Sequence, residues 1–505
     1  MTKKVFKTLM PAALCLLTTA CSTYSNDGES SYFYDGYVNG YLSEPNGMPT
    51  PSGGDKFSEY QENPFVATST QPISTFSVDA DGASYAIMRR YLGQGFAVNP
   101  SSVRIEEFLN YFTFDYPSPA DGHSVAINAE VGPCPWNADH QLVRLGLKGK
   151  ELAESEVPRA NFVFLIDVSG SMDSNDKIGL LKSGLTTLLH QLRPTDRISL
   201  ITYSGEVRKL LESTPVSQAA TIEQAIGRLR ASGCTAGGEA LKMAYEEALA
   251  NYDPTANNRI ILGTDGDFNV GVTSTSALTE MVESYAQKGI YLTCLGFGIG
   301  NLNDAMMEQI SNKGNGTYHY IDSEDELMKV FVHERQRFVS VACDTKCQVT
   351  FNSTFVSQYR LIGYENRVMN NEDFNDDEKD AGEIGAGQTV TALYEIVLTP
   401  KAWEKVYDEE RTLVTLDVRY KPSLQASSLP LQTHVSAMQL WDSPTPNLTF
   451  AAGVAAYGML LRNSSYKGDA TFDMARLLVS QSLDFDPHGL RAQLLQLINQ
   501  AAKDK

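Results

Sequence analysis

The sequence predicts an α/β fold: a doubly wound, mostly parallel sheet inserted in a β-sandwich. Over residues 161–338, short apolar runs rich in β-branched residues alternate with amphipathic helical periods. This alternation is typical of a parallel sheet with helices on both faces. Strand-like runs without such helices occupy residues 123–160 and 339–446. Each of these two sets is too small for a sturdy sheet alone, so we expect them to combine into one sandwich that the α/β domain interrupts.

Residues 1–20 have the features of a secretory signal peptide, with three lysines, then an apolar run, then small residues before Cys21. This end resembles a bacterial lipoprotein signal, which implies that Cys21 is acylated and attached to a membrane. By the same resemblance, Ser22 after the cysteine implies an outer-membrane lipoprotein, on either its periplasmic or its external face. The alternative is simple secretion with Cys21 as an ordinary thiol.

Residues 21–62 predict a flexible tether, because Asn, Gly, Ser, Pro and acidic residues follow one another without a hydrophobic period. Residues 63–122 predict a small α+β segment with a strand at 75–78 and two helices. We expect Asp79 and Asp81 to serve in a turn and a helix cap; calcium binding is the alternative, without the full spacing of a calcium loop.

The elements expected in the α/β domain follow from the alternation. The expected strands are 162–167, 197–203, 207–211, 259–264, 290–297 and 317–321, and the expected helices are 176–192, 218–230, 237–251, 276–288, 302–312 and 323–338. For the sandwich we expect strands at 125–131, 141–147, 348–356, 359–364, 388–398 and 411–420.

Three features of the C-terminal third complete the expected fold. The acidic insert 371–380 is expected to be a solvated loop, with calcium binding as the alternative. Cys343 and Cys347 allow a disulfide in an oxidising compartment, although a continuous strand would hold them too far apart; this pairing stays open. Residues 447–505 predict a helical region in which small residues form the packing face.

The charge excludes one class of partner. The formal net charge is −20, and it is −23 without residues 1–20, which carry three lysines and no acidic residue. So acidic a chain is not expected to bind nucleic acid or anionic lipid headgroups. Cations and basic partners suit it better.

Three loops are expected to meet at the carboxyl edge of the parallel sheet, where ligands bind in such folds. The first is Asp167-x-Ser169-x-Ser171, the second is the glycine-rich segment 232–238 with Thr235, and the third places Asp265 directly after a buried strand. Carboxylate and hydroxyl oxygens are ligands that Mg²⁺ accepts while it keeps several waters. In the alternative interpretation Asp167 only caps a turn and the serines only begin a helix.

This pattern resembles the von Willebrand factor type A domain and its metal-ion-dependent adhesion site, over the whole alternating region. The resemblance implies that Ser169, Ser171 and Thr235 bind Mg²⁺, with Mn²⁺ or Ca²⁺ as substitutes, and that Asp167 and Asp265 lie in or just behind the ligand shell. It also implies that a carboxylate of a partner protein completes the coordination.

Several motifs outside this domain resemble bacterial lipoproteins that carry the domain between distinct N- and C-terminal segments. They are Asn63-Pro64-Phe65, 74–79, 103–112, Cys134-Pro135-Trp136-Asn137, 360–367 and 380–387.

A binding protein is therefore expected, and not an enzyme. A phosphatase of the haloacid dehalogenase type needs a second aspartate where Ser169 stands, and the serines lack the Gly-x-Ser-x-Gly elbow of hydrolases. A nucleotide-binding Gly-x-x-x-x-Gly-Lys-Ser/Thr loop does not occur in the sequence. The alternative function is a metal-independent structural or assembly scaffold in the cell envelope.

Overall fold

The computed structural model describes residues 54–120, 122–233, 238–266, 275–404 and 411–502. The predicted signal peptide, Cys21 and most of the predicted tether lie outside these residues. Within them, no helix is both long enough and apolar enough to cross a membrane.

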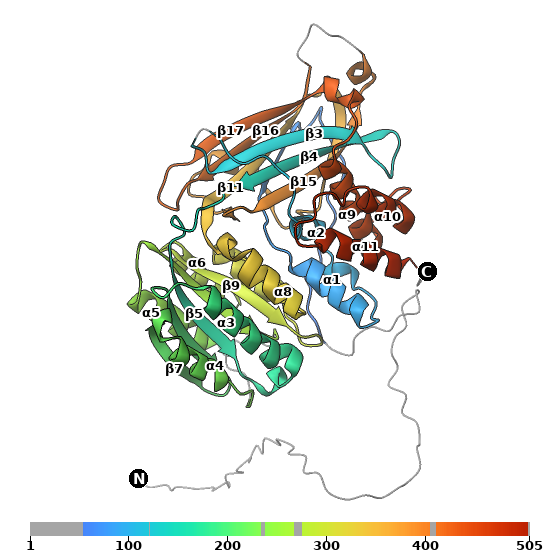
Figure 1. Ribbon diagram of the computed structural model, residues 1–505. Coiled ribbons are helices and arrows are strands. Elements are labelled where there is room, and N and C mark those ends of the chain that lie inside the picture. The colour runs from blue at the N-terminus through green and yellow to red at the C-terminus, as the bar shows by residue number, and fades with distance from the viewer. Residues whose placement is uncertain (1–53, 121, 234–237, 267–274, 405–410, 503–505) are drawn as a thin grey trace, which may run out of the picture. The chain divides into compact units, whose positions relative to one another are not determined.

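The central sheet is doubly wound, as predicted (Figure 1). Its strand order is β10-β9-β8-β5-β6-β7, and all neighbours are parallel except the edge strand β7, which is antiparallel to β6. The central strands are buried along most of their length because helices cover both faces. The strands are β5 (Arg159–Asp167), β6 (Arg197–Tyr203), β7 (Val207–Pro215), β8 (Ala256–Thr264), β9 (Ile290–Phe297) and β10 (Tyr318–Ile321).

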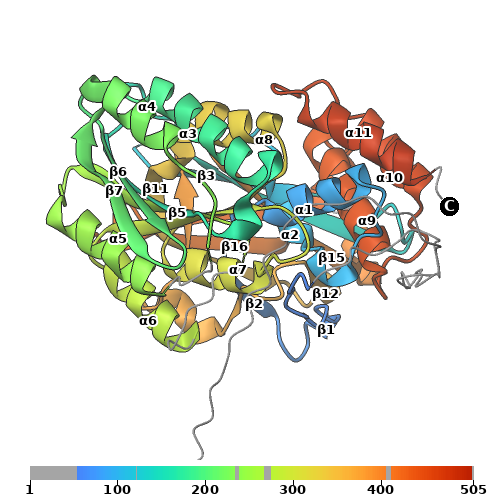
Figure 2. The ribbon, with the colours of Figure 1, turned by 90° about the horizontal axis from the view of Figure 1, so that it is seen from below.

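Two helical layers enclose this sheet, as Figure 2 shows. One layer contains α3 (Leu180–Gln191), α4 (Ala219–Gly227) and α8 (Glu324–Met328); the other contains α5 (Gly238–Ala250), α6 (Thr275–Ala286) and α7 (Asp304–Lys313). Each layer has its own hydrophobic core against the sheet. The helix expected from residue 176 begins with a π-helical turn, Asn175–Gly179, before α3.

The β-sandwich has the predicted interrupted connectivity. One sheet has the order β1-β12-β15-β4-β3, so strands before and after the α/β domain pair directly. The other has the order β13-β2-β11-β16-β17, with β14 paired to β11, and the two sheets share one hydrophobic core. The first sheet contains β1 (Val66–Ala67), β3 (Val125–Pro133), β4 (His140–Gly149), β12 (Val356–Ile362) and β15 (Thr389–Leu398); the second contains β2 (Ile73–Ser77), β11 (Ser340–Phe351), β13 (Val368–Met369), β14 (Gly382–Gly385), β16 (Thr412–Lys421) and β17 (Leu429–Ser436).

The segment predicted at 63–122 is built into this sandwich, since β1 pairs with β12 and β2 pairs with β11. The tether prediction was wrong for residues 54–62. Asp55 accepts hydrogen bonds from the backbone of Gly300 and Leu302, and Glu62 accepts one from Ser464 Oγ. Isolated polar residues can dock on a folded domain in this way without any hydrophobic period that the sequence would reveal.

Helix α1 (Ala83–Gly93) links the α/β domain to the C-terminal helices because both of its faces are apolar. Ala86 and Tyr91 belong to the core beneath β9 and β10, whereas Tyr85 and Met88 belong to the core of the C-terminal helices. That second core also takes α2 (Ile105–Asn110), α9 (Pro446–Arg462), α10 (Phe472–Ser480) and α11 (Leu490–Ala501). Because α1 is buried on two sides, it fixes the position of the C-terminal helices relative to the α/β domain.

Three local predictions can be compared with the described residues. Cys343 and Cys347 are both free and buried on β11, so they do not form a disulfide. The strand expected at 348–356 is in fact the end of β11, followed by a turn at Asn352 and the start of β12. In the acidic insert, Asp377 pairs with Arg419 and Asp380 pairs with Lys313; calcium binding there stays the alternative.

Candidate metal centre

Two of the predicted acidic residues lie side by side at the carboxyl edge of the central sheet. Asp167 is the last residue of β5, and Asp265 follows the last residue of β8. These strands are parallel neighbours, with Ile166 opposite Gly263, so both chains leave the sheet at the same edge. Both aspartates are buried.

The first loop places two hydroxyl groups next to Asp167. Asp167 Oδ1 accepts a hydrogen bond of 2.8 Å from Ser169 N, and its Oδ2 accepts one of 3.0 Å from Thr264 Oγ1. The hydroxyl oxygens of Ser169 and Ser171 are 3.0 Å apart. Ser169 is buried and Ser171 is exposed. The two hydroxyl groups therefore lie between the buried carboxylate of Asp167 and the protein surface.

The second loop packs against the first. Gly170 N donates to Gly233 O at 3.0 Å, and Ser232 N donates to Val168 O at 2.7 Å. Gly233 has a φ of +86°, a conformation that favours glycine. Ser232 and Gly233 of the glycine-rich segment therefore contact the Asp-x-Ser-x-Ser loop, whereas Thr235 lies outside the described residues.

Asp265 is held by a turn that only glycine fits. Gly266 has a φ of +96°, and a Cβ atom there would lie 2.4 Å from Asn303 N. The close approach of the 301–303 loop thus fixes the backbone directly after Asp265. Among the described residues, Asp265 Oδ1 has no hydrogen-bond partner although it is buried.

Lys177 is a member of this site that the sequence analysis did not identify. Its Nζ lies 2.9 Å from Asp265 Oδ2 and donates to Ser171 O at 2.9 Å. A Cβ atom at Gly298 would lie 2.2 Å from Lys177 Cε, so the absence of a side chain at Gly298 gives the lysine its place. Its position at the start of a helix is typical of an ordinary surface lysine. No signal in the sequence distinguishes such a lysine from one that contacts the site.

Burial raises the pKa of Asp167 to about 6, and the nearby Asp265 carboxylate acts in the same direction. Hydrogen bonds from Ser169 and Thr264 lower it, but less than burial raises it. Two buried carboxylates at one edge repel each other, so a positive charge placed between them and the solvent stabilises both. Lys177 supplies one such charge to Asp265.

These residues fit a hard divalent cation. Two carboxylates and two hydroxyls converge, and one carboxylate oxygen lacks a protein partner among the described residues. Oxygen ligands of this kind suit Mg²⁺, which retains water in the remaining positions. Asp167 already accepts two hydrogen bonds, which suits it to orient hydroxyls and water around a cation.

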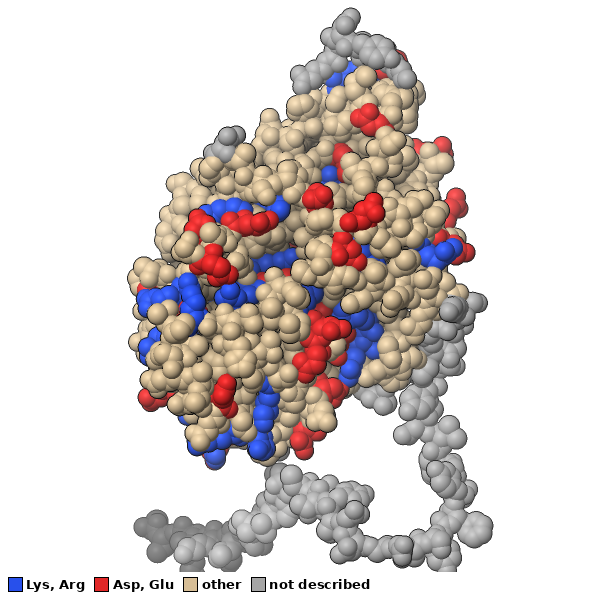
Figure 3. Space-filling view, in the orientation of Figure 1, with Lys and Arg blue, Asp and Glu red and all other residues tan. Residues whose placement is uncertain are grey.

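A polar groove of about 430 Å³ begins beside the first loop. Its lining includes Val168, Ser232 and Gly233 of the two loops, and also Arg208, Arg228, Arg230 and Glu206. On the face of the molecule seen in Figure 3, acidic and basic side chains are interspersed and do not separate into areas of one sign. A strongly acidic chain can thus present local basic groups next to the candidate metal centre.

Comparisons with known proteins agree with this architecture. The family model described as von Willebrand factor type A domain matches residues 161–333, the one described as von Willebrand factor matches 51–144, and the one described as Uncharacterized protein YfbK, C-terminal, matches 336–503. Over 474 residues the chain is 38% identical to a protein of Escherichia coli K12 named "Uncharacterized protein YfbK", covering 89% of this chain and 81% of that protein.

Other similarities concern smaller parts or lower identity. The chain is 33% identical to the mouse protein named "Inter alpha-trypsin inhibitor, heavy chain 4" over 185 residues. This similarity covers 34% of this chain and 19% of the mouse protein. A solved structure titled "von Willebrand factor type A from Catenulispora acidiphila" aligns with 76% of this chain and 91% of its own, at a TM-score of 0.44 and 15% identity. On its 38% identity to the E. coli protein over most of both chains, the chain belongs to the YfbK family, and its central residues 161–333 match the von Willebrand factor type A domain.

Proposed function

We propose that this protein is a cell-envelope lipoprotein that binds a partner protein through Mg²⁺ held by Asp167, Ser169, Ser171, Thr235 and Asp265. Its central domain belongs to a family in which protein–protein interaction is common. The proposal assigns it a binding role and no catalytic step. The observation that carries it is the convergence of two buried aspartates and two serine hydroxyls at one edge of the sheet.

The chemistry of the site supports a carboxylate as the contact group of the partner. A divalent cation bound partly by neutral hydroxyls keeps enough positive charge to attract one more anionic oxygen. The arginine-lined groove beside the loop offers further contacts to an acidic segment. We therefore expect the partner to present an exposed Asp or Glu with other acidic residues nearby.

Attachment to the outer membrane through an acylated Cys21 is part of the proposal, and its support is the sequence of residues 1–21. Residues 54–56 dock on the loop at 300–302, which also touches Gly266 beside the candidate centre. The chain that follows the proposed anchor thus reaches the folded part close to this centre. Cys21→Ala is expected to shift the protein from the membrane fraction to the soluble fraction.

A metal-independent scaffold is the second candidate, and Lys177 is the observation that favours it. The ammonium group already neutralises Asp265, which allows a stable loop without a divalent cation. Both candidates predict binding to envelope proteins. They differ in whether this binding depends on metal.

A pull-down from envelope extracts distinguishes the two. We expect partners to be recovered in Mg²⁺ and lost in chelator, and Ser169→Ala to lose them under both conditions. Ser183→Ala, a serine on α3 that contacts Glu324 away from the loop, is the matched control. Equal recovery in Mg²⁺ and chelator would reject the metal-dependent function in favour of the scaffold.

A further inference from the structure

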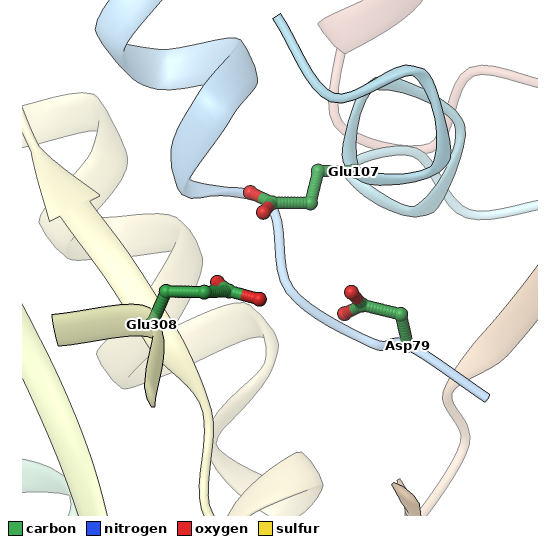
Figure 4. Close-up of side chains that lie close together, drawn as sticks. All are labelled: Asp79, Glu107 and Glu308. Carbon is green, nitrogen blue, oxygen red and sulfur yellow. The ribbon is translucent and has the colours of Figure 1, made fainter. Parts of the chain in front are cut away.

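A second group of acidic side chains meets where the N-terminal segment packs against α7 (Figure 4). Asp79 lies between β2 and α1, Glu107 lies on α2, and Glu308 lies on α7. One oxygen atom from each carboxylate lies within 4.8 Å of the others, and all three residues are buried. The group therefore joins the N-terminal segment to a helix of the α/β domain.

The contacts of these carboxylates leave part of each group available. Asp79 accepts from Asp81 N and from Arg367 Nε, both at 2.9 Å. Glu107 accepts from Ser84 N at 2.8 Å and pairs with Arg104. A carboxylate oxygen has room for a further partner after one hydrogen bond.

The ion-pair network around the group is not neutral. Arg104 and Arg367 are its two guanidinium groups, and the carboxylates paired with them are Asp79, Asp81, Glu107, Asp304 and Glu308. Five carboxylates and two guanidinium groups give a formal charge of −3 when all are ionised. A buried net charge of this size is strongly unfavourable unless protons or a cation compensate for it.

Three acceptor atoms point to a cation as the missing partner. Within the described residues, Glu308 Oε2, Asp81 Oδ2 and Asn366 Oδ1 are buried and have no hydrogen-bond donor. Asp81 Oδ2 is 3.9 Å from the nearest guanidinium nitrogen, of Arg367, which is an ion pair without a hydrogen bond. All three residues line a cavity of about 480 Å³, which gives an ion a route from solvent.

We propose that this junction is a second divalent-cation site, with Asp79, Glu107 and Glu308 as its carboxylate ligands and Ca²⁺ as its ion. Asp81 and Asn366 are placed to add oxygen ligands from the cavity side. Ca²⁺ suits the site better than Mg²⁺, because it accepts six to eight oxygen ligands in irregular geometry and loses its water more easily. It shares no proposed ligand with the candidate centre at Asp167.

The proposed ion has a structural consequence. It joins α7 to the segment that carries α1 and α2, which are otherwise held there by apolar contacts and the two arginines. In the absence of a cation, burial raises the pKa values of Glu107, Asp81 and Glu308, so that protons compete for the same oxygens.

Equilibrium dialysis of the purified protein against CaCl₂ in excess MgCl₂, followed by elemental analysis, tests the site. We expect one Ca²⁺ per chain in the wild type and also in Asp265→Asn, which disables the other centre. Glu308→Gln keeps the shape of the side chain and is expected to reduce Ca²⁺ affinity at least tenfold. Glu283→Gln, an acid on α6 that is paired with Lys313 outside the group, should retain the wild-type affinity.

Thermal melting separates loss of the ion from loss of the fold. Glu308→Gln removes one buried negative charge, so without Ca²⁺ it should melt no lower than the wild type, and added Ca²⁺ should no longer raise its melting temperature. Wild-type protein that takes up no Ca²⁺, or a Glu308→Gln variant that binds Ca²⁺ as the wild type does, would overturn the proposal. Neither result bears on the function proposed for the centre at Asp167.

Discussion

Replacing Lys177 by Met should have opposite effects on stability and on metal binding. The ammonium group is 2.9 Å from Asp265 Oδ2, and the lysine and aspartate side chains are 15% and 0% exposed. The substitution keeps most of the aliphatic side chain but leaves Asp265 buried without its counter-charge. A divalent cation would then be the remaining source of positive charge at this carboxylate.

The size of both effects follows from this geometry. At 2.9 Å the direct attraction is about 6 kcal/mol for an effective dielectric constant of about 20, before the hydration of the ammonium is subtracted. Breaking a buried ion pair costs about 3 to 5 kcal/mol, and we expect the lower end because Lys177 is partly exposed. A hydrogen bond to a charged group contributes about 1.5 to 3 kcal/mol. Because Mg²⁺ no longer has to displace the hydrogen bond from Lys177 to Asp265 in the variant, it should bind roughly 10- to 100-fold more tightly.

Urea denaturation and Mg²⁺ titration measure the two quantities. Without Mg²⁺, Lys177→Met should have a free energy of unfolding about 3 kcal/mol below the wild type, and saturating Mg²⁺ should restore most of it. Lys182→Met is the control, because Lys182 on α3 contacts backbone carbonyls and forms no ion pair among the described residues. A Lys177→Met variant with unchanged or weaker Mg²⁺ affinity would refute the reasoning that the ammonium and the cation compete for Asp265.

Five further predictions concern the same edge of the sheet. Ser169→Ala should lower Mg²⁺ affinity at least tenfold in calorimetry while the far-ultraviolet circular dichroism stays unchanged; unfolding would show a structural role instead. Mg²⁺ affinity should fall about tenfold per pH unit below pH 6, the pKa to which burial raises Asp167, and a flat profile from pH 7 to 5 would contradict this. The free energy of unfolding without cation should depend on pH in the opposite direction. Folding raises the pKa of Asp167 and so favours its protonated form; the stabilisation from this group is therefore complete below its unfolded pKa and is lost as the pH rises through about 6. Gly266→Ala should lower the free energy of unfolding by about 3 kcal/mol, because of its positive φ and the contact at Asn303 N, whereas Gly227→Ala, with open space around it, should change it little. Asp55→Ala should speed limited proteolysis near residue 55, because it removes the hydrogen bonds that hold this segment to the 300–302 loop; an unchanged cleavage rate would mean that other contacts hold it.

The parallel strands were predictable because their apolar runs are continuous and separated by helical periods. Asp167 and Asp265 could be brought together from sequence alone, since each directly follows or ends such a strand and parallel strands share their carboxyl edge. The insertion in the sandwich was predictable from the small number of strands on each side. These features depend on local pattern and simple topology.

Pairings between distant segments were not predictable in the same way. Strand β1 has two residues and pairs with β12, where Val66 lies opposite Tyr359. The edge strand β17 is mostly exposed, so its residues carry no clear apolar alternation. A short strand or an exposed edge strand depends on its partner for stability, and a single sequence does not show that partner.

The two charged groups show the same limit. Lys177 lies in the π-helical turn that precedes α3, and Glu308 lies in the middle of α7. A charged residue on a helix is ordinarily solvent-exposed. Their roles come from the segments that cover them: the turn at Gly298 for Lys177, and α2 with the residues before α1 for Glu308. Only the tertiary arrangement distinguishes them from surface residues.

Isothermal titration calorimetry of Mg²⁺ into the wild type and into Asp265→Asn tests the central claim most directly. The Glu308→Gln background removes any contribution from the second site. The account predicts that the wild type and Glu308→Gln bind one Mg²⁺ with similar affinity, and that adding Asp265→Asn abolishes the binding heat. No heat in the wild type, or the same binding after Asp265→Asn, would contradict a metal centre at the edge where β5 and β8 end.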